Sequence, residues 1–269
     1  MFKTATQLKS CSLRAWDGEI GKVEDLLFDN LHWGLRYFVV DTGKWLKRHS
    51  VLISPESVHT PEWDNHVLPV ELTKEQIQKS PGLEKDQPVS RQYETAMRQH
   101  YGWPPYWGAM HGEAVIGLPA GAMAKPPPST QRESVNEADL DGDRHLFSTS
   151  AVNGHHVLAS DGEIGHITDF LVDDLRWTIR YLVVDTRNWW PGRKVILSPW
   201  WASDIDWPAR RVSMDLTRDA IRNSPPYDPE KIYTATEYGE LHDYYGRPRY
   251  NEDEAVAEAV VRPDSPKYP

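Results

Sequence analysis

Short runs of apolar residues alternate with polar ones along the chain, and each run is bounded by residues that favour turns. Residues 12–16 lead into Asp17-Gly18, a dipeptide that favours the positive φ angles of a tight hairpin turn. Residues 19–29 then form a run long enough for a bent strand, with Gly21 as a bulge position. Residues 35–41 are aromatic and β-branched, which predicts a strand buried on at least one face.

The pattern continues with a strand at residues 50–53 and a second hairpin around Asp64-Asn65. Residues 73–76 have the spacing of a capping box and predict a short helix. Residues 93–101 carry aromatic and apolar side chains at helical spacing, and Gly102 follows as a helix stop. Because five or six short strands cannot form a large open sheet, a small closed barrel is the expected way to hide the sheet edges.

This pattern is written twice in the chain. Asp17-Gly18-Glu19-Ile20-Gly21 recurs 144 positions later at residues 161–165, and Val39-Val40-Asp41-Thr42 recurs at residues 183–186. Aligned without a gap at that offset, residues 17–81 share 26 identities in 65 positions with the second copy. The repeat predicts two copies of one fold, each about 105 residues long.

The repeat sets the expected domain boundaries at residues 1–107 for the first copy and 145–250 for the second. Residues 108–144 between them are rich in Gly, Pro and acidic side chains, which cannot bury a core, so they are interpreted as an irregular linker. Residues 251–269 are interpreted as an acidic tail.

Each copy resembles a PRC-barrel domain, the small β-barrel named after the cytoplasmic part of the photosynthetic reaction-centre H subunit. The resemblance rests on Asp-Gly-Glu-Ile-Gly, the acidic turns at Asp29-Asn30 and Asp173-Asp174, the series Trp-x-x-Arg-Tyr-x-Val-Val-Asp-Thr, and a strand ending in Ser-Pro. It covers about 80 residues of each copy. It implies a mainly β chain of two tandem PRC-type barrels, each with short C-terminal helices, joined by the linker.

The resemblance also implies a mode of use, since family members are adaptor or regulatory modules that contact other proteins. This sequence lacks the N-terminal membrane helix of a reaction-centre H subunit and the extra N-terminal domain of the ribosome-maturation members. Quinone electron transfer and ribosome assembly are therefore not carried over to this chain.

Composition narrows the function classes. The 30 Lys and Arg against 40 Asp and Glu give a formal charge of −10, which argues against general nucleic-acid binding. The single cysteine, Cys11, excludes an intramolecular disulfide and is interpreted as a buried bystander. No run of about 18 apolar residues predicts a transmembrane segment, and no secretory signal is evident, so a cytoplasmic location is expected.

The polar residues shared by the two copies are interpreted as structural. Asp-Gly is expected to make the hairpin turn, the aspartates after Val-Val to hydrogen-bond the following turn, and the arginines to pair with a nearby carboxylate. These repeat-matched positions are Asp17, Gly18, Arg36, Asp41, Asp161, Gly162, Arg180 and Asp185.

No catalytic, cofactor-binding or metal-binding residue is predicted. Adjacent histidines such as His155-His156 point to opposite faces of a strand, and the histidines of one copy are not kept in the other. Residues 139–143 resemble a calcium loop only weakly, because the Gly comes too early. The chain is therefore expected not to be an enzyme and to need no cofactor.

Aromatic clusters exceed what two barrels need. They either cover the barrels and pack one copy on the other, or form an interface for a partner protein or a homodimer. The residues concerned are Trp103, Trp107, Trp189, Trp190, Trp200 and Trp201.

The expected function is that of a non-enzymatic adaptor acting on an unidentified protein partner. Two alternatives stay open at this point. Convergent buried carboxylates or histidines in a pocket between the barrels would favour a small-ligand-binding or enzymatic protein. A local basic patch at Arg210-Arg211 or around Arg187, Arg193 and Lys194 would favour a ribosome- or RNA-associated factor.

Overall fold

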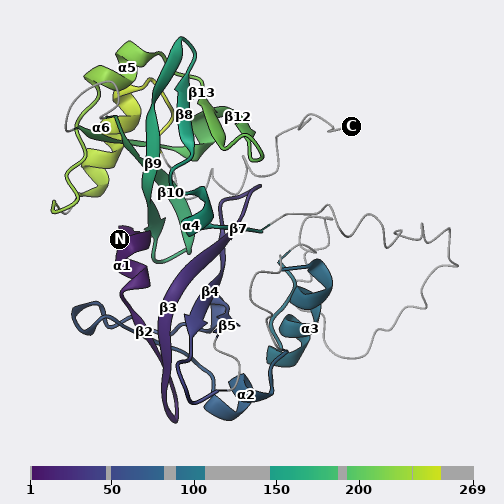
Figure 1. The fold of residues 1–269 in the computed structure, drawn as a ribbon. Helices are drawn as coiled ribbons and strands as arrows, with labels where there is room; N and C mark the ends of the chain where they lie inside the picture. The colour runs from purple at the N-terminus through teal and green to yellow at the C-terminus, as the bar shows by residue number, and fades with distance from the viewer. Residues whose placement is uncertain are drawn as a thin grey trace, which may run out of the picture.

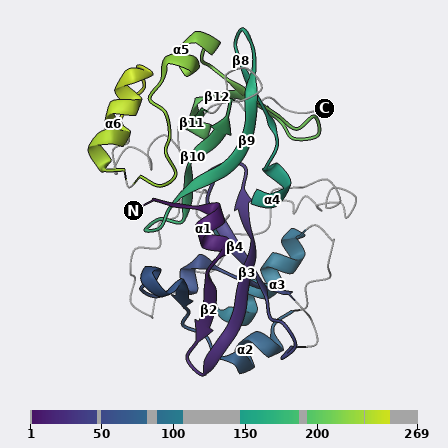
Figure 2. The same cartoon turned by 60° about the vertical axis from the view of Figure 1, so that its left-hand side comes forward.

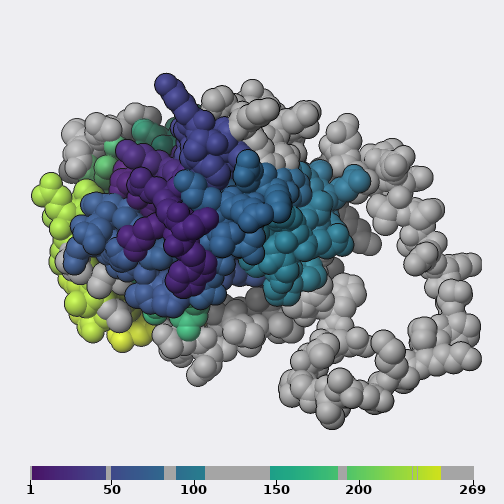
Figure 3. Space-filling view, turned by 90° about the horizontal axis from the view of Figure 1, so that it is seen from below, coloured from purple at the N-terminus to yellow at the C-terminus, as the bar shows by residue number. Residues whose placement is uncertain are grey.

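The protein is mainly β, with two sheets and a few short helices (Figure 1). The computed structural model describes residues 2–46, 50–81, 89–106, 146–186, 193–231 and 233–249. The predicted linker and tail, and the side chains of Trp107, Trp189 and Trp190, lie outside these residues. Figure 3 views the lower end of Figure 1, where the first copy faces the reader and the yellow-green second copy shows at the left edge.

The first copy contributes five strands to one sheet, in the order β5-β4-β3-β2-β6. They are β2 (Ser12–Ala15), β3 (Gly18–Asp29), β4 (Leu35–Asp41), β5 (Ser50–Ile53) and β6 (Val67–Pro69). Neighbours are antiparallel except β2 and β6, which run parallel. The 3-10 turns η1 (Pro55–Ser57) and η2 (Trp63–Asn65) and the helices α2 (Lys74–Lys79) and α3 (Arg91–Tyr101) complete the copy.

The second copy repeats this arrangement, in the order β11-β10-β9-β8-β13-β12. Its strands are β8 (His156–Ala159), β9 (Gly162–Asp173), β10 (Thr178–Asp185), β11 (Lys194–Leu197), β12 (Ala202–Asp206) and β13 (Arg211–Met214). The turn η4 (Pro199–Trp201) and the helices α5 (Arg218–Asn223) and α6 (Ala235–Tyr244) follow. The two long helices, α3 and α6, lie on opposite sides of the molecule in Figures 1 and 2.

Local sequence explains most of these elements. Thr73 caps α2 in a capping box with Gln76, as its spacing predicts. The first hairpin turns one residue earlier than predicted, at Trp16-Asp17, and Gly18 begins β3 with φ +139°. The bulge predicted near Gly21 is present, since Leu13 pairs with Gly21 and Arg14 with Glu19, so one residue is skipped.

The hydrogen-bond ladders of the described strands do not close into a ring. In the first sheet they end at β5 and β6, and in the second at β11 and β12. The structure therefore shows two sheets, while a closed barrel in each copy stays a prediction.

The two copies exchange their first strands. β1 (Phe2–Thr4) pairs with β9 of the second copy, and β7 (Leu146–Ser148) pairs with β3 of the first. The registers are equivalent, since Thr4 faces Leu171 and Ser148 faces Leu27, the positions 144 residues apart. Each exchanged strand leads into a short helix at the junction, α1 (Ala5–Lys9) or α4 (Thr149–Val152), as Figure 2 shows.

A pair of backbone hydrogen bonds marks the centre of this exchange. The Leu35 amide donates to the Trp177 carbonyl at 2.6 Å, and the Ile179 amide donates to the Trp33 carbonyl at 2.8 Å. These positions are again 144 residues apart, so the copies are related by an approximate two-fold axis beside Gly34. We refer to the exchanged strands, α1, α4 and these bonds together as the seam.

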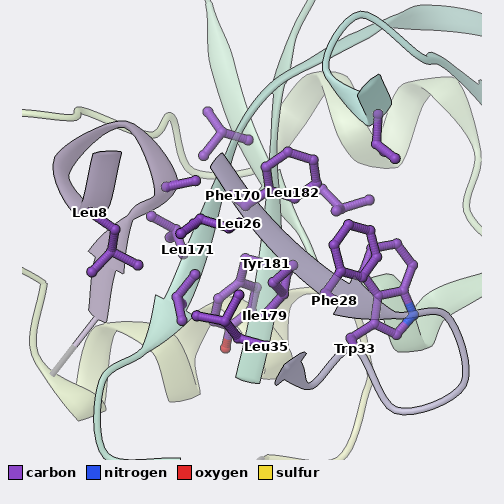
Figure 4. Close-up of a cluster of buried hydrophobic side chains, with 14 of the residues drawn as sticks. Leu8, Leu26, Phe28, Trp33, Leu35, Phe170, Leu171, Ile179, Tyr181 and Leu182 are labelled. Atoms are coloured by element: carbon purple, nitrogen blue, oxygen red, sulfur yellow. The ribbon is translucent and has the colours of Figure 1, made fainter. Parts of the chain in front are cut away.

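One hydrophobic core runs through the seam. Figure 4 shows side chains of both copies interdigitating there. Phe28 of β3 stacks on Trp33 with ring centroids 5.0 Å apart, and it lies 6.1 Å from the ring of Phe170 on β9. The copies therefore share apolar burial, the main stabilising term in folding.

Asp25, in the middle of β3, ties the seam together with polar contacts. Its carboxylate accepts hydrogen bonds from the hydroxyls of Ser148 and Thr149 and, at 3.2 Å, from the Ser150 amide. Lys9 of α1 forms an ion pair with it at 3.1 Å. Burial alone would raise the pKa of Asp25, but the Ser148 hydrogen bond and the Lys9 charge outweigh it and hold that pKa below its ordinary value.

We expect the two copies to stay together when the covalent connection between them is cut. A protease site would be placed between residues 107 and 145, and the cleaved protein followed by size-exclusion chromatography and circular dichroism. The fragments should co-elute with unchanged spectra, because the exchanged strands and shared core do not depend on the connection. Separation into two folded fragments would show that the seam is weaker than its contacts indicate.

Candidate functional site

The repeat-matched acids of the hairpin turns cap helices. The Asp17 carboxylate accepts a hydrogen bond from the Lys74 amide at 2.8 Å, and Asp161 accepts one from the Arg218 amide at 2.7 Å. Both amides belong to the first residue of a helix, α2 or α5, where backbone N–H groups have no partner inside the helix. Gly18 and Gly162, which follow the two aspartates, share the same φ of +139°.

The aspartates at the end of β4 and β10 lie against glycines of the neighbouring strands. A Cβ at Gly21 would stand 1.9 Å from the Asp41 carbonyl oxygen, and one at Gly165 would stand 2.0 Å from that of Asp185. Asp41 also accepts a hydrogen bond from the Gly43 amide at 2.9 Å. The last Gly of each Asp-Gly-Glu-Ile-Gly motif is therefore required for close strand packing.

The two repeat-matched arginines lie beside the acid that ends the preceding strand. Arg36 donates through Nε to Asp29 Oδ2 at 2.9 Å, and the equivalent Arg180 Nε stands 3.8 Å from Asp173 Oδ2. Asp29 is buried at 4% exposure. An arginine opposite a buried carboxylate supplies the charge that burial requires, so this pair holds the turn beside the seam.

The two copies differ at the residue beside this arginine–aspartate pair. Gly34 of the first copy corresponds to Thr178 of the second. A Cβ at Gly34 would lie 2.9 Å from the Arg36 guanidinium carbon and 3.0 Å from Asp29 Oδ2. Thr178 carries a Cβ at this position, and in that copy the arginine Nε stands farther from its aspartate, at 3.8 Å against 2.9 Å.

Asp29 also orders the turn that follows it. Its carboxylate accepts hydrogen bonds from the amides of Leu31, His32 and Gly34, at 2.7–3.1 Å. Burial alone would raise the pKa of Asp29, but the hydrogen bond from His32 and the charge of Arg36 outweigh it, so that pKa lies below its ordinary value.

A hollow of about 180 Å³ opens beside this turn, between the two copies. His32, Leu35 and Arg36 line it from the first copy, and Arg176 and Trp177 line it from the second. The hollow thus lies in the region between the copies where the sequence left a ligand site as an alternative, with two arginines and one histidine in its wall.

The helices over the two sheets differ in chemistry. Under α3, buried Glu94 accepts a hydrogen bond from the Tyr106 hydroxyl at 2.8 Å, and buried Arg98 pairs with Glu56 at 2.6 Å. Burial and the Glu94 charge raise the pKa of Tyr106. Under α6, the position equivalent to Arg98 is His242, whose Nε2 lies 2.9 Å from the hydroxyl of buried Tyr181.

The predicted interface tryptophans that the structure describes pack against neighbouring side chains of the protein. Trp103 stacks on Tyr101, with ring centroids 4.3 Å apart, and is half-buried. Trp201 is buried at 6% exposure against His242, and Trp200 is half-buried against the core. Their role in binding a partner stays a prediction.

The most exposed large apolar side chains lie elsewhere. Leu31 and Leu175, equivalent positions in the turns beside the seam, are 63% and 78% exposed, and Trp16 in the first hairpin is 72% exposed. Leu175 also donates its amide to Asp173, at 3.0 Å, as Leu31 does to Asp29. These leucines were not among the predicted site residues, although the sequence carries a signal for them: a leucine stands two positions after Asp29 and again after Asp173.

Two observations concern metals and membranes. Among the described residues, no group of three or more His, Cys, Asp and Glu side chains is arranged to hold a metal ion. Within the same ranges, no helix combines the length and apolar character needed to cross a bilayer.

The single cysteine, Cys11, is buried as predicted, and burial raises the pKa of its thiol.

Comparisons with known proteins add no identification, because no protein-family model and no curated protein matches the chain.

We expect Gly34→Ala to destabilise the protein by about 1–3 kcal/mol, because the new Cβ must displace the Arg36–Asp29 pair. The matched control is Thr178→Ala, where a Cβ is already accommodated. Urea unfolding of both variants checks this. Equal losses at the two positions would contradict the contact argument.

The Asp29 carboxylate should make the free energy of unfolding depend on pH in the acidic range. Since its pKa is lower in the folded protein than the unfolded value of about 3.9, its contribution is present above that value and is lost as pH falls through the folded pKa. Asp29→Asn should therefore be less stable than wild type at pH 7 and show a smaller further loss between pH 5 and pH 3. Exposed Asp64→Asn is the control and should keep the wild-type slope in urea unfolding.

Proposed function

We propose that this chain is a non-enzymatic adaptor protein of the PRC-barrel type, in which two tandem small barrels act together as one scaffold that binds another protein. The proposal joins the sequence resemblance to the exchange of strands between the copies. A scaffold with a shared core keeps its surface features at fixed positions, which lowers the entropic cost of binding.

The single observation that carries the proposal is the pair Leu31 and Leu175. Both side chains are largely exposed and recur at equivalent positions of the two copies, so they offer matched apolar surface to a partner. Asp29 and Asp173 fix the two turns by accepting backbone hydrogen bonds within them. The leucines are thus presented by ordered backbone on both sides of the seam.

The repeat-matched polar residues support the same conclusion. Asp17 and Asp161 cap helices, Asp41 holds a turn, and Arg36 neutralises a buried aspartate. These groups are the candidates a catalytic hypothesis would use first. The aspartates hold backbone amides, and Arg36 holds the Asp29 carboxylate. Their recurrence in both copies follows from the fold that both copies share.

We expect the double variant Leu31→Asp, Leu175→Asp to lose partner binding by about tenfold or more, because charges would replace apolar contacts at the interface. The partner would be captured from native extracts, identified by mass spectrometry and tested again with purified proteins. Trp16→Asp is the control, since Trp16 is equally exposed but is not matched in the second copy. Both variants should unfold at the wild-type temperature.

The same experiment separates the other partner classes. A second copy of the chain would appear as a wild-type dimer that the double variant converts to a monomer. An RNA partner would bind with a steep salt dependence, which apolar leucine contacts do not produce. Unchanged partner binding by the leucine variant would refute the proposed surface.

A further inference from the structure

The two copies carry different residues at one position that lines the hollow between them. On the first-copy side its wall includes Glu56, at the start of η1. The equivalent residue of the second copy is Trp200, which packs half-buried against the hydrophobic core. The wall of the hollow therefore carries an acidic side chain at a position where the other copy carries an indole.

The size of the hollow limits its occupant. About 180 Å³ is slightly larger than an engineered apolar cavity of about 150 Å³ that holds benzene. A molecule of roughly one six-membered ring with a small substituent would fill it. Leu35, Pro55 and Trp177 provide apolar wall for such a body.

The polar part of the wall favours a negative charge on that molecule. The Arg176 side chain is 38% exposed and stands 3.6 Å from Asp173, and Arg36 is 23% exposed. A guanidinium carries five N–H donors in a planar fork that matches a carboxylate. The acid in this wall, Glu56, is already paired with Arg98 at 2.6 Å, so its charge is compensated from outside the hollow.

We propose that this hollow binds a small organic carboxylate, with its ring or alkyl body against Trp177 and Leu35 and its carboxylate on Arg176. The site uses residues of both copies, so it exists only when the seam is formed. It is independent of the proposed adaptor function, since it involves neither Leu31 nor Leu175.

Sodium benzoate is the probe, and benzamide is its neutral isostere. Titration of the ¹⁵N-labelled full chain should shift the backbone amides of residues 176–178 with a Kd on the order of 1 mM, as expected for a ligand of this size. Benzamide should bind about tenfold more weakly or not at all, because it lacks the charge that the arginine recognises.

The variants test the residue assigned to the carboxylate. Arg176→Gln should weaken benzoate binding about tenfold or more, and Arg176→Lys should give an intermediate loss, since charge is kept but the fork is removed. Arg211→Gln, which changes the same charge at an exposed position on β13, should bind as wild type. Thermal unfolding confirms that each variant is folded.

Three results would overturn the proposal. One is equal shifts by benzoate and benzamide, and another is an Arg176→Gln variant that binds like Arg211→Gln. The third is a benzoate shift map that centres away from residues 176–178. None of these results bears on partner binding by the leucine surface, so the two proposals fail separately.

Discussion

The arrangement of the two copies depends on the exchange of the first strand between them. Each sheet is extended by a strand whose own copy lies on the other side of the seam, and that strand pairs in equivalent register in both directions. Buried backbone groups must be paired, so neither β3 nor β9 keeps its full set of hydrogen bonds alone. Asp25 adds a charged link, because it accepts from the start of α4 while pairing with Lys9 of α1.

The copies differ in side-chain chemistry even on the strands that they exchange. At the seam, Lys3 lies 4.5 Å from the Trp63 ring, and its equivalent Phe147 stacks on Trp207 at 3.9 Å. One copy uses a cation–π contact where the other uses aromatic stacking, and both fill the same space. The repeat therefore preserves shape and backbone bonding more strictly than side-chain chemistry.

This distinction explains what could be predicted from the sequence. The strands and the capped helix at Thr73 follow from local periodicity and capping, and the 144-residue offset reveals the duplication. The exchange could not be predicted, because residues 2–4 pair equally well in principle with either copy and only tertiary packing selects β9. A site between the copies stayed an open alternative from the sequence, but its position could not be predicted, because only tertiary packing brings its lining residues together from the two copies.

Duplication within one chain also changes what a site on the axis can do. In a symmetric dimer, any residue beside the two-fold axis faces its own copy, so a ligand bound there has two equivalent orientations. Here His32 corresponds to Arg176, and Gly34 pairs with Thr178. The two sides of the axis therefore differ in charge and in bulk, and a molecule with one charged end meets one preferred orientation. Fusion of two copies thus turns a symmetric seam into a surface able to distinguish the ends of a ligand.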